Sequence, residues 1–343
     1  MQYSKEVILD TNIVRYLLYG NDDQKKKYES IFCEMDKRQY GYSFTDFTMC
    51  ELLSFLDNSK STLENSKSNN KYQEELKQLA AFISDNKIRL SFIGKDISDC
   101  FYSLGDKNNI DSVRTVVFES FAKSLSTLLA EVLRITIVCL SSALYKSDTK
   151  LYQELYHEIL SGISSEEAFT YYYDFCYEKV LDSLYNKNML IKDTIEHLFK
   201  YLILRLVARF YTFGDSKFDE ETIFKGLCVK YSSDKYDVII KELNRKADIN
   251  VQKFVGNCNI SEYERIFILK QVDFVVNRRR QIHHNDFIDF INVKRSIEHK
   301  CDYYLSSDKP FFTNIINIFD GEADVIDFIN ESRKKCFELE ILK

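Results

Sequence analysis

A single proline and nine glycines in 343 residues most constrain what this chain can fold into. Proline and glycine are the residues that most often interrupt helices and form tight turns. A chain so poor in both is expected to form long helices joined by few sharp turns. Its content of 45% hydrophobic and 29% charged residues is typical of a folded globular protein, and its length allows one large domain or two ordinary ones.

The first hundred residues alternate between strand and helix patterns. The predicted strands are 7–9, the start of 41–56, and 87–94, and the predicted helices begin at Ile13, within 41–56, at 72 and at 96. This βαβα order implies a parallel sheet with helices on both faces. A polar run at 57–70 is expected to be a mobile loop.

Long helical patterns dominate from 106 to 275, without a repeat of fixed period. The segment 124–144 comes nearest to a membrane span, but Glu131 and Arg134 lie three apart near its centre, where a bilayer disfavours charge. We therefore expect a buried helix with a partly solvated ion pair, and no membrane partner. The apolar segment 192–210 is either the centre of this region or the face of a homo-oligomer.

The α/β pattern returns near residue 280. A helix is predicted at 285–300, a strand at 302–305, a loop at 306–312, and two further strands at 314–319 and 337–342 with a helix between them. The fold class is thus α/β, a parallel sheet flanked by helices and interrupted by a large all-α insertion. The predicted division is 1–105 and 276–343 for the two parts of the core, and 106–275 for the insertion.

Acidic residues follow the predicted strands or share one face of a helix. Asp10 ends the first strand, Glu51 opens a helix, and Asp308 follows the strand at 302–305. Asp286 and Asp289 lie three apart on one helix face. Each has a plainer interpretation as a helix cap or a surface residue. If the strands are neighbours in a parallel sheet, however, these carboxylates meet at its carboxyl edge.

Such a cluster of carboxylates repels itself unless a cation neutralises it. Mg²⁺ and Mn²⁺ prefer oxygen ligands, and a pair of these ions about 4 Å apart activates water toward a phosphodiester. An all-acidic site without histidine or cysteine ligands therefore indicates phosphate chemistry.

Four segments in order resemble the motifs of PIN-domain nucleases. They are ILDTNIVRYLL, FTMCELLSFL, the helix–strand–helix FISDNKIRLSFIGKDISDCFYSL, and DFIDFINVKRSIEHKCDYYLSSD. The resemblance covers roughly 1–105 and 276–343, about half of the chain. The long insertion is a departure from the family, whose members have a short connection there.

The resemblance implies a PIN-like sheet and a metal-dependent endoribonuclease that hydrolyses single-stranded RNA. The residues that match the family's metal-binding and catalytic acids are Asp10, Glu51, Asp308 and, on the helix, Asp289 or Asp286. Asn12 and Ser306 match its supporting polar residues. Family members often serve as toxins or defence effectors, so a cognate inhibitor or a sensor protein that docks on the insertion is expected.

Three arginines precede the helix acids, namely Arg278, Arg279 and Arg280. They can bind the phosphates of RNA, or they can be a solvated helix end that pairs with nearby acids. The net charge of −6 predicts no overall attraction to nucleic acid, so such binding needs a local basic patch.

The nine cysteines are scattered singly, which indicates reduced thiols in a cytoplasmic protein and disfavours structural zinc. Two alternatives to the endoribonuclease remain open. One is a PIN-like scaffold or interaction protein without activity. The other is a DNA nuclease related to flap endonucleases, against which the acidic balance of the chain argues.

Overall fold

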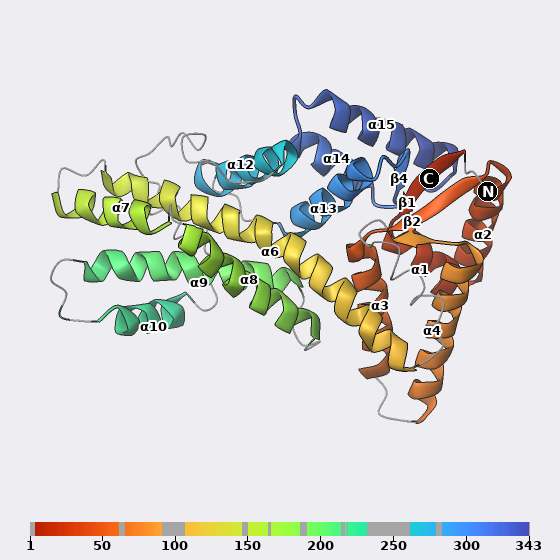
Figure 1. The fold of residues 1–343 in the computed structure, drawn as a ribbon, viewed down its shortest axis with the longest axis horizontal. Coiled ribbons are helices and arrows are strands. Elements are labelled where there is room, and N and C mark those ends of the chain that lie inside the picture. The colour runs from red at the N-terminus through yellow and green to blue at the C-terminus, as the bar shows by residue number, and fades with distance from the viewer. Residues whose placement is uncertain are drawn as a thin grey trace. The chain divides into compact units, whose positions relative to one another are not determined.

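The structure is a computed structural model, and it describes residues 4–61, 66–90, 107–145, 150–163, 166–185, 191–213, 217, 219–231, 261–278 and 283–342. It divides into two compact units, one formed by 1–123 with 288–343 and the other by 124–287 (Figure 1). The first unit holds the sheet. Its elements are β1 (Lys5–Leu9), α1 (Thr11–Tyr19), α2 (Asp22–Lys37), β2 (Tyr40–Phe44), α3 (Asp46–Ser61), α4 (Ser66–Asp85), β3 (Arg89–Leu90), β4 (Tyr303–Leu305), α14 (Lys309–Ile318) and α15 (Ala323–Glu338).

The second unit is helical. Its helices are α7 (Lys150–Ile163), α8 (Glu166–Tyr185), α9 (Ile191–Thr212), α10 (Glu220–Lys230) and α12 (Glu262–Val276). Two more helices, α6 (Lys107–Tyr145) and α13 (His284–Glu298), contain the points at which the chain passes between the units. None of the described residues of the second unit forms a strand.

The four strands form one parallel sheet in the order β3-β2-β1-β4, as Figure 1 shows for β1, β2 and β4. The predicted α/β class with a parallel sheet is confirmed, in a chain that helices dominate. β1 is buried because Val7–Leu9 is an unbroken apolar run that neighbours β2 on one side and β4 on the other. β4 therefore lies directly beside β1, with Leu9 opposite Leu305.

The carboxyl ends of these strands lead into helices at one edge of the sheet. β1 passes through Asp10 into α1, β2 passes through Thr45 into α3, and β4 is followed after three residues by α14. The amide N–H of Asp10 donates to the carbonyl of Leu305 at 2.9 Å, so pairing with β4 continues one residue beyond β1. The side chains that follow β1 and β4 are thereby brought close together.

Two of the strand predictions are wrong. The segment 314–319 lies mainly in α14, and 337–342 contains the end of α15 and the turns after it. In α14 the buried residues Phe311, Phe312, Ile315 and Ile318 follow the spacing of one helix face. A short apolar run cannot by itself distinguish a strand from a buried helix, and the wider spacing decides for the helix.

The loop predicted at 57–70 is also shorter than expected, because α3 extends to Ser61 and α4 begins at Ser66. The strand predicted at 87–94 is described only at β3, and the helix predicted at 96–104 lies outside the described residues.

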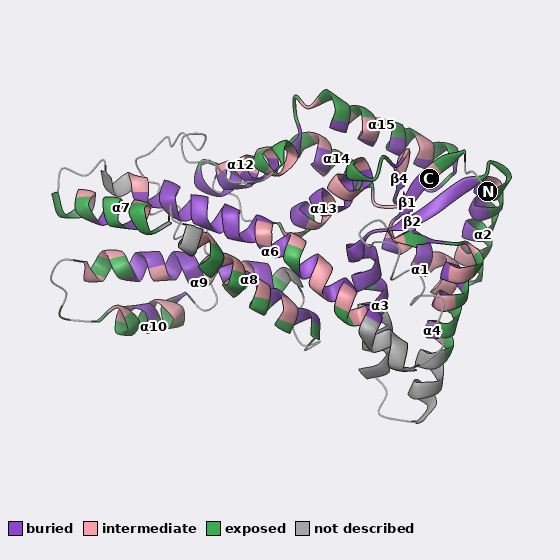
Figure 2. Cartoon of the chain, in the orientation of Figure 1, coloured by how far each residue is buried: buried purple, intermediate pink, exposed green. Residues whose placement is uncertain are grey.

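The long helix α6 carries the predicted ion pair. Arg134 Nη2 lies 2.7 Å from Glu131 Oε2, and both residues are buried, whereas a partly solvated pair was expected. Figure 2 shows much of α6 as buried. Within α6, Val113–Ser142 is the one segment of the described residues that is long and apolar enough to cross a membrane. Its most apolar window is 89% buried in the structure, a property that core helices of globular proteins share.

Candidate functional site

Asp10 is held from both sides by residues of the neighbouring strand and the loop after it. Ser306 Oγ donates to Asp10 Oδ2 at 2.7 Å, and the hydroxyl of Tyr304 donates to Asp10 Oδ1 at 3.3 Å. The parallel pairing of β1 with β4 produces both contacts. The orientation of this carboxylate is thus set by residues far away in the sequence.

Ser306 also links Asp10 to Asp308. Its hydroxyl oxygen accepts from the amide N–H of Asp308 at 3.0 Å while it donates to Asp10. The structure thereby places Ser306 between two of the predicted acids. Asn12, the other predicted supporting residue, lies half-buried in the first turn of α1.

The interpretation of Asp10 and Asp308 as plain helix caps can be examined against the caps that this chain does form. Asn21, Asp219 and Ser261 each accept a hydrogen bond from a backbone N–H in the first turn of their helices. Asp10 and Asp308 occupy the same position on α1 and α14, yet neither makes such a side-chain hydrogen bond. The two carboxylates thus differ from the ordinary caps of this chain, although the first-turn N–H groups of Thr11 and Phe311 lie near enough to lower their pKa values.

Burial raises the pKa of Asp10 to about 6, against an ordinary value of 3.8. The hydrogen bond from Ser306 and the nearby N–H of Thr11 lower this pKa, and the negative charge of Asp308 raises it. Burial raises the pKa of Asp308 as well, while the N–H of Phe311 lowers it. Both acids thus sit where a negative charge is poorly solvated.

Glu51 does not open its helix as predicted, because α3 begins five residues earlier, at Asp46. It nevertheless belongs to the same group of charges. The residue keeps an exposed surface, but the protein atoms around its carboxyl raise its pKa from 4.5 to about 7. The hydroxyl of Thr11 and the positive charge of Arg15 lower this pKa, and the charge of Asp10 raises it. Glu51 and Asp10 therefore interact across the start of α1.

Tyr304 lies among these acids. It is 1% exposed, and burial raises the pKa of its hydroxyl far above the ordinary value, with further contributions from Asp10, Asp289 and Glu51. Asp308 joins the group through its effect on Asp10. We call Asp10, Glu51, Asp289 and Asp308 the acidic cluster.

One buried hydroxyl beside the cluster lacks a well-formed hydrogen bond. Thr11 is 1% exposed, and its Oγ1 makes no hydrogen bond of normal geometry, although it lies near enough to Glu51 to lower the pKa of that carboxyl. Buried polar atoms in folded proteins are nearly always hydrogen-bonded, and an exception calls for an explanation. A buried oxygen without a well-formed hydrogen bond, next to poorly solvated carboxylates, is what a site for a hydrated cation would leave.

The type of donor in the cluster fits Mg²⁺ or Mn²⁺, which bind carboxylate oxygens and water. The positions of the side chains fit less closely. Among the residues that the structure describes, no three histidine, cysteine, aspartate or glutamate side chains are close enough together to hold a metal ion. In the conformation described, the acidic cluster is therefore not a complete set of metal ligands.

The two helix acids have different surroundings. Asp289 is half-buried and acts on Tyr304, whereas Asp286 is 2% exposed and its Oδ2 lies 3.4 Å from Gln271 Nε2 of α12. The structure thus links Asp289 to the acidic cluster and shows Asp286 in contact with the second unit's own helix.

Of the three predicted RNA-binding arginines, only Arg278 is described. It is exposed, and its Nε lies 3.2 Å from Asp273 Oδ2 in the preceding helix. Arg279 and Arg280 lie outside the described residues. The ion pair agrees with the alternative of a solvated helix end.

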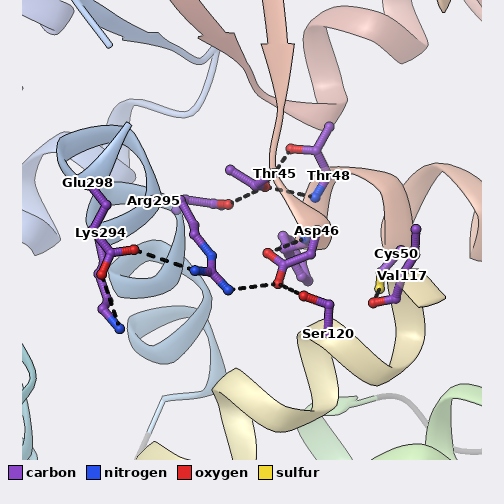
Figure 3. Close-up of polar contacts among 11 residues, drawn as sticks. Thr45, Asp46, Thr48, Cys50, Val117, Ser120, Lys294, Arg295 and Glu298 are labelled. Carbon is purple, nitrogen blue, oxygen red and sulfur yellow. Dashed lines mark hydrogen bonds and ion pairs between the residues drawn. The ribbon is translucent and has the colours of Figure 1, made fainter. Parts of the chain in front are cut away.

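Three residues of the site were not singled out from the sequence, namely Thr11, Tyr304 and Asp46. In an extended segment, side chains two residues apart point to the same side, so Tyr304 lies on the same side as Ser306. This two-residue spacing from Ser306 could have identified Tyr304 from the sequence. Asp46 is completely buried at the start of α3, where Ser120 Oγ lies 3.1 Å and Arg295 Nη2 lies 3.4 Å from its Oδ2 (Figure 3). No local sequence pattern predicts the ion pair between Asp46 and Arg295.

A scan against models of known protein families, a search of curated proteins and a search of solved structures each found no significant match to this chain.

Proposed function

We propose that this protein is a metal-dependent endoribonuclease that hydrolyses phosphodiester bonds of single-stranded RNA. The observation that carries the proposal is the acidic cluster, in which Asp10, Glu51 and Asp289 act on Tyr304 and Asp308 acts on Asp10, beside the buried hydroxyl of Thr11. Structural stability alone gives no reason to collect carboxylates in this way, because their mutual repulsion opposes folding.

Asp10, Glu51, Asp289 and Asp308 are the residues that would hold the cation. Mg²⁺ or Mn²⁺ at this place would activate water and neutralise the charge that develops on the phosphodiester. The protein's own contribution is to hold Asp10 through Ser306 and Tyr304, and to keep Glu51 close to a positive charge, that of Arg15.

The choice of RNA as substrate rests on the resemblance of the four sequence segments to PIN-domain nucleases. The same resemblance supports a role as a toxin or defence effector in the cytoplasm. A cognate inhibitor or sensor that docks on residues 106–275 belongs to this proposal.

The test is cleavage of a labelled single-stranded RNA with Mn²⁺ by the wild-type protein and by Asp10→Asn. The substitution keeps the shape of the side chain and removes one negative charge from the cluster. We expect cleavage to fall on the order of a hundredfold or more, since metal activation of water contributes several kcal/mol to catalysis.

Asp219→Asn is the matched control, because Asp219 is a true helix cap, bonded to Thr222, and asparagine caps as well as aspartate. It should cleave like the wild type. Unchanged cleavage by Asp10→Asn would remove Asp10 from the site, and cleavage that persists in excess chelator would exclude the metal mechanism.

A second candidate is a PIN-like scaffold without activity. The observation in its favour is that no three ligand-type side chains of the described residues are placed to hold an ion. Calorimetric titration with Mn²⁺ separates the two candidates, since a scaffold should give no heat that depends on Asp10.

A further inference from the structure

A chain of three hydrogen bonds runs through the interior of the first unit to Asp10. Thr45 Oγ1 donates to Asn292 Oδ1 at 2.7 Å, Asn292 Nδ2 donates to the hydroxyl of Tyr304 at 3.2 Å, and that hydroxyl donates to Asp10 Oδ1 at 3.3 Å. The first three of these residues are buried, Asn292 at 2% exposure. The chain thus joins the start of α3, the middle of α13, β4 and the end of β1.

The orientation of the Asn292 amide gives the bonds of this chain their direction. Its Oδ1 lies toward Thr45 Oγ1, which donates to it, while Thr45 Oγ1 accepts from the amide N–H of Thr48 at 3.0 Å and also lies 3.0 Å from Thr48 Oγ1. An amide side chain has one accepting oxygen and one donating nitrogen, so Asn292 then presents its nitrogen to Tyr304. The oxygen of Tyr304 accepts there, and its single proton is directed at Asp10.

The hydroxyl of Tyr304 is suited to donate. Burial and the neighbouring carboxylates raise its pKa well above the ordinary value, so it keeps its proton. Ser306 holds the other oxygen of Asp10, and the carboxylate is therefore fixed at both ends.

A second contact with the start of α3 fixes the position of α13, the helix that carries Asn292. Thr45 and Asp46 are consecutive. Thr45 bonds Asn292, and Asp46 pairs with Arg295 (Figure 3), which lies three residues after Asn292 on the same face of α13. Asp289 lies three residues before Asn292 on the same face. The start of α3 thus makes two polar contacts with α13, the helix that carries Asp289 of the acidic cluster.

We infer that Asn292 and Tyr304 are positioning residues, which hold the carboxylate of Asp10 in the orientation needed to bind the cation. This inference rests on the proposed function, because it assumes that Asp10 is a ligand. Partners that orient a ligand are general in metal sites, and their loss typically weakens metal binding 10- to 100-fold, so an effect on the order of tenfold is expected.

The test compares Tyr304→Phe with Tyr303→Phe by calorimetric titration with Mn²⁺. Both changes remove one hydroxyl from β4, but Tyr303 packs its ring near Tyr40 and Lys5. We expect Tyr304→Phe to bind Mn²⁺ on the order of tenfold more weakly, and Tyr303→Phe to bind like the wild type. RNA cleavage by Tyr304→Phe should be reduced at limiting Mn²⁺, and it should need on the order of tenfold more of the ion than the wild type to reach its plateau.

Asp10→Asn, measured in parallel, separates failure of this inference from failure of the proposed function. If Asp10→Asn loses Mn²⁺ binding and Tyr304→Phe retains the full affinity, then Tyr304 does not position Asp10. In that case the assignment of Asp10 as a metal ligand is still supported. If the wild type gives no binding heat, both proposals fall.

A second pair of variants covers the case in which Tyr304→Phe does not fold. Thr45→Val removes the hydroxyl that orients Asn292, and Thr45→Ser retains it. Mn²⁺ affinity should fall in the valine variant and return in the serine variant, measured below the melting temperature of each. Equal affinity in the two variants would overturn the inference.

Discussion

Ser306 and Asp10, which are 296 positions apart in the sequence, are joined by a 2.7 Å hydrogen bond from Ser306 Oγ to Asp10 Oδ2. The same hydroxyl oxygen accepts from the amide of Asp308. One serine thus sets the relation between the acid that follows β1 and the acid that follows β4. Two members of the acidic cluster are therefore connected through the protein itself.

The acidic cluster should make the metal-free protein less stable as the pH rises. The folded-state pKa values of Asp10 and Glu51, about 6 and about 7, lie above their ordinary values of 3.8 and 4.5, so the folded state binds these protons more tightly. This contribution is fully present below pH 4 and is lost as the pH rises through 6 to 7. In thermal melts, the melting temperature of the double variant Asp10→Asn/Glu51→Gln should rise relative to that of the wild type between pH 5 and pH 8.

Addition of Mn²⁺ should reverse this trend, because the ion binds the ionised carboxylates. It should raise the melting temperature of the wild type more at pH 8 than at pH 5, and that of the double variant at neither pH. A wild-type-to-variant difference that is the same at pH 5 and pH 8 would contradict the raised pKa values.

Thr11→Val should separate folding from metal binding. The change removes a buried hydroxyl that makes no hydrogen bond of normal geometry, and an unsatisfied buried polar group costs about 1–3 kcal/mol. Without metal, the free energy of unfolding measured in urea should therefore be unchanged or raised by about 1 kcal/mol. Mn²⁺ affinity should fall, because the hydroxyl is lost from the site.

Thr11→Ser retains the hydroxyl and is the matched control for both measurements. A valine variant that loses stability and keeps full Mn²⁺ affinity would show that the hydroxyl serves the fold alone.

Asp289→Asn and Asp286→Asn should have different effects on metal binding. Asp289 acts on the hydroxyl of Tyr304, whereas Asp286 is buried near Gln271. Calorimetry should show Mn²⁺ affinity reduced on the order of tenfold in the first variant and unchanged in the second. The reverse result would assign the ligand role to Asp286.

Arg295→Met should destabilise the first unit. Asp46 is completely buried, and loss of one partner of a buried ion pair costs about 3–5 kcal/mol. Because the side chain of Arg295 is 21% exposed, solvent reduces this cost, and we expect about 2 kcal/mol in urea unfolding. Asp46→Asn in the same background should recover part of the loss.

The control for Arg295→Met is Arg265→Met in α12, which removes an exposed ion pair with Glu262. That change should have little effect on unfolding. Equal stability of Arg295→Met and the wild type would show that the pair with Asp46 contributes nothing.

The sheet and the placement of the acids could be predicted from the sequence because their signals are local. Val7–Leu9 is an apolar run followed directly by Asp10 and a helical pattern, and Asp308 follows β4 in a similar way. Carboxyl ends of parallel strands share one edge, so the approach of these two acids follows from strand order alone.

The supporting residues could not be predicted because their roles depend on contacts between distant segments. Tyr304 is an ordinary buried aromatic in the sequence, and only the register of β4 beside β1 directs its hydroxyl to Asp10. Asn292 gains its role from the contact of α13 with the start of α3. The strand wrongly predicted at 314–319 failed for a simpler reason, since six residues are too few to separate a strand from a helix face.

The pairing of β1 with β4 also determines when a complete site can first exist during synthesis. Ribosomes add roughly 5–20 residues per second, so on the order of tens of seconds separate Asp10 from the segment that supplies Tyr304, Ser306 and Asp308. Until that segment leaves the ribosome, the growing chain carries Asp10 and Glu51 without the residues that orient Asp10. An interrupted translation product that stops before β4 would therefore lack part of the proposed site, and the proposed activity would arise only in chains that have been translated through the strand beside β1.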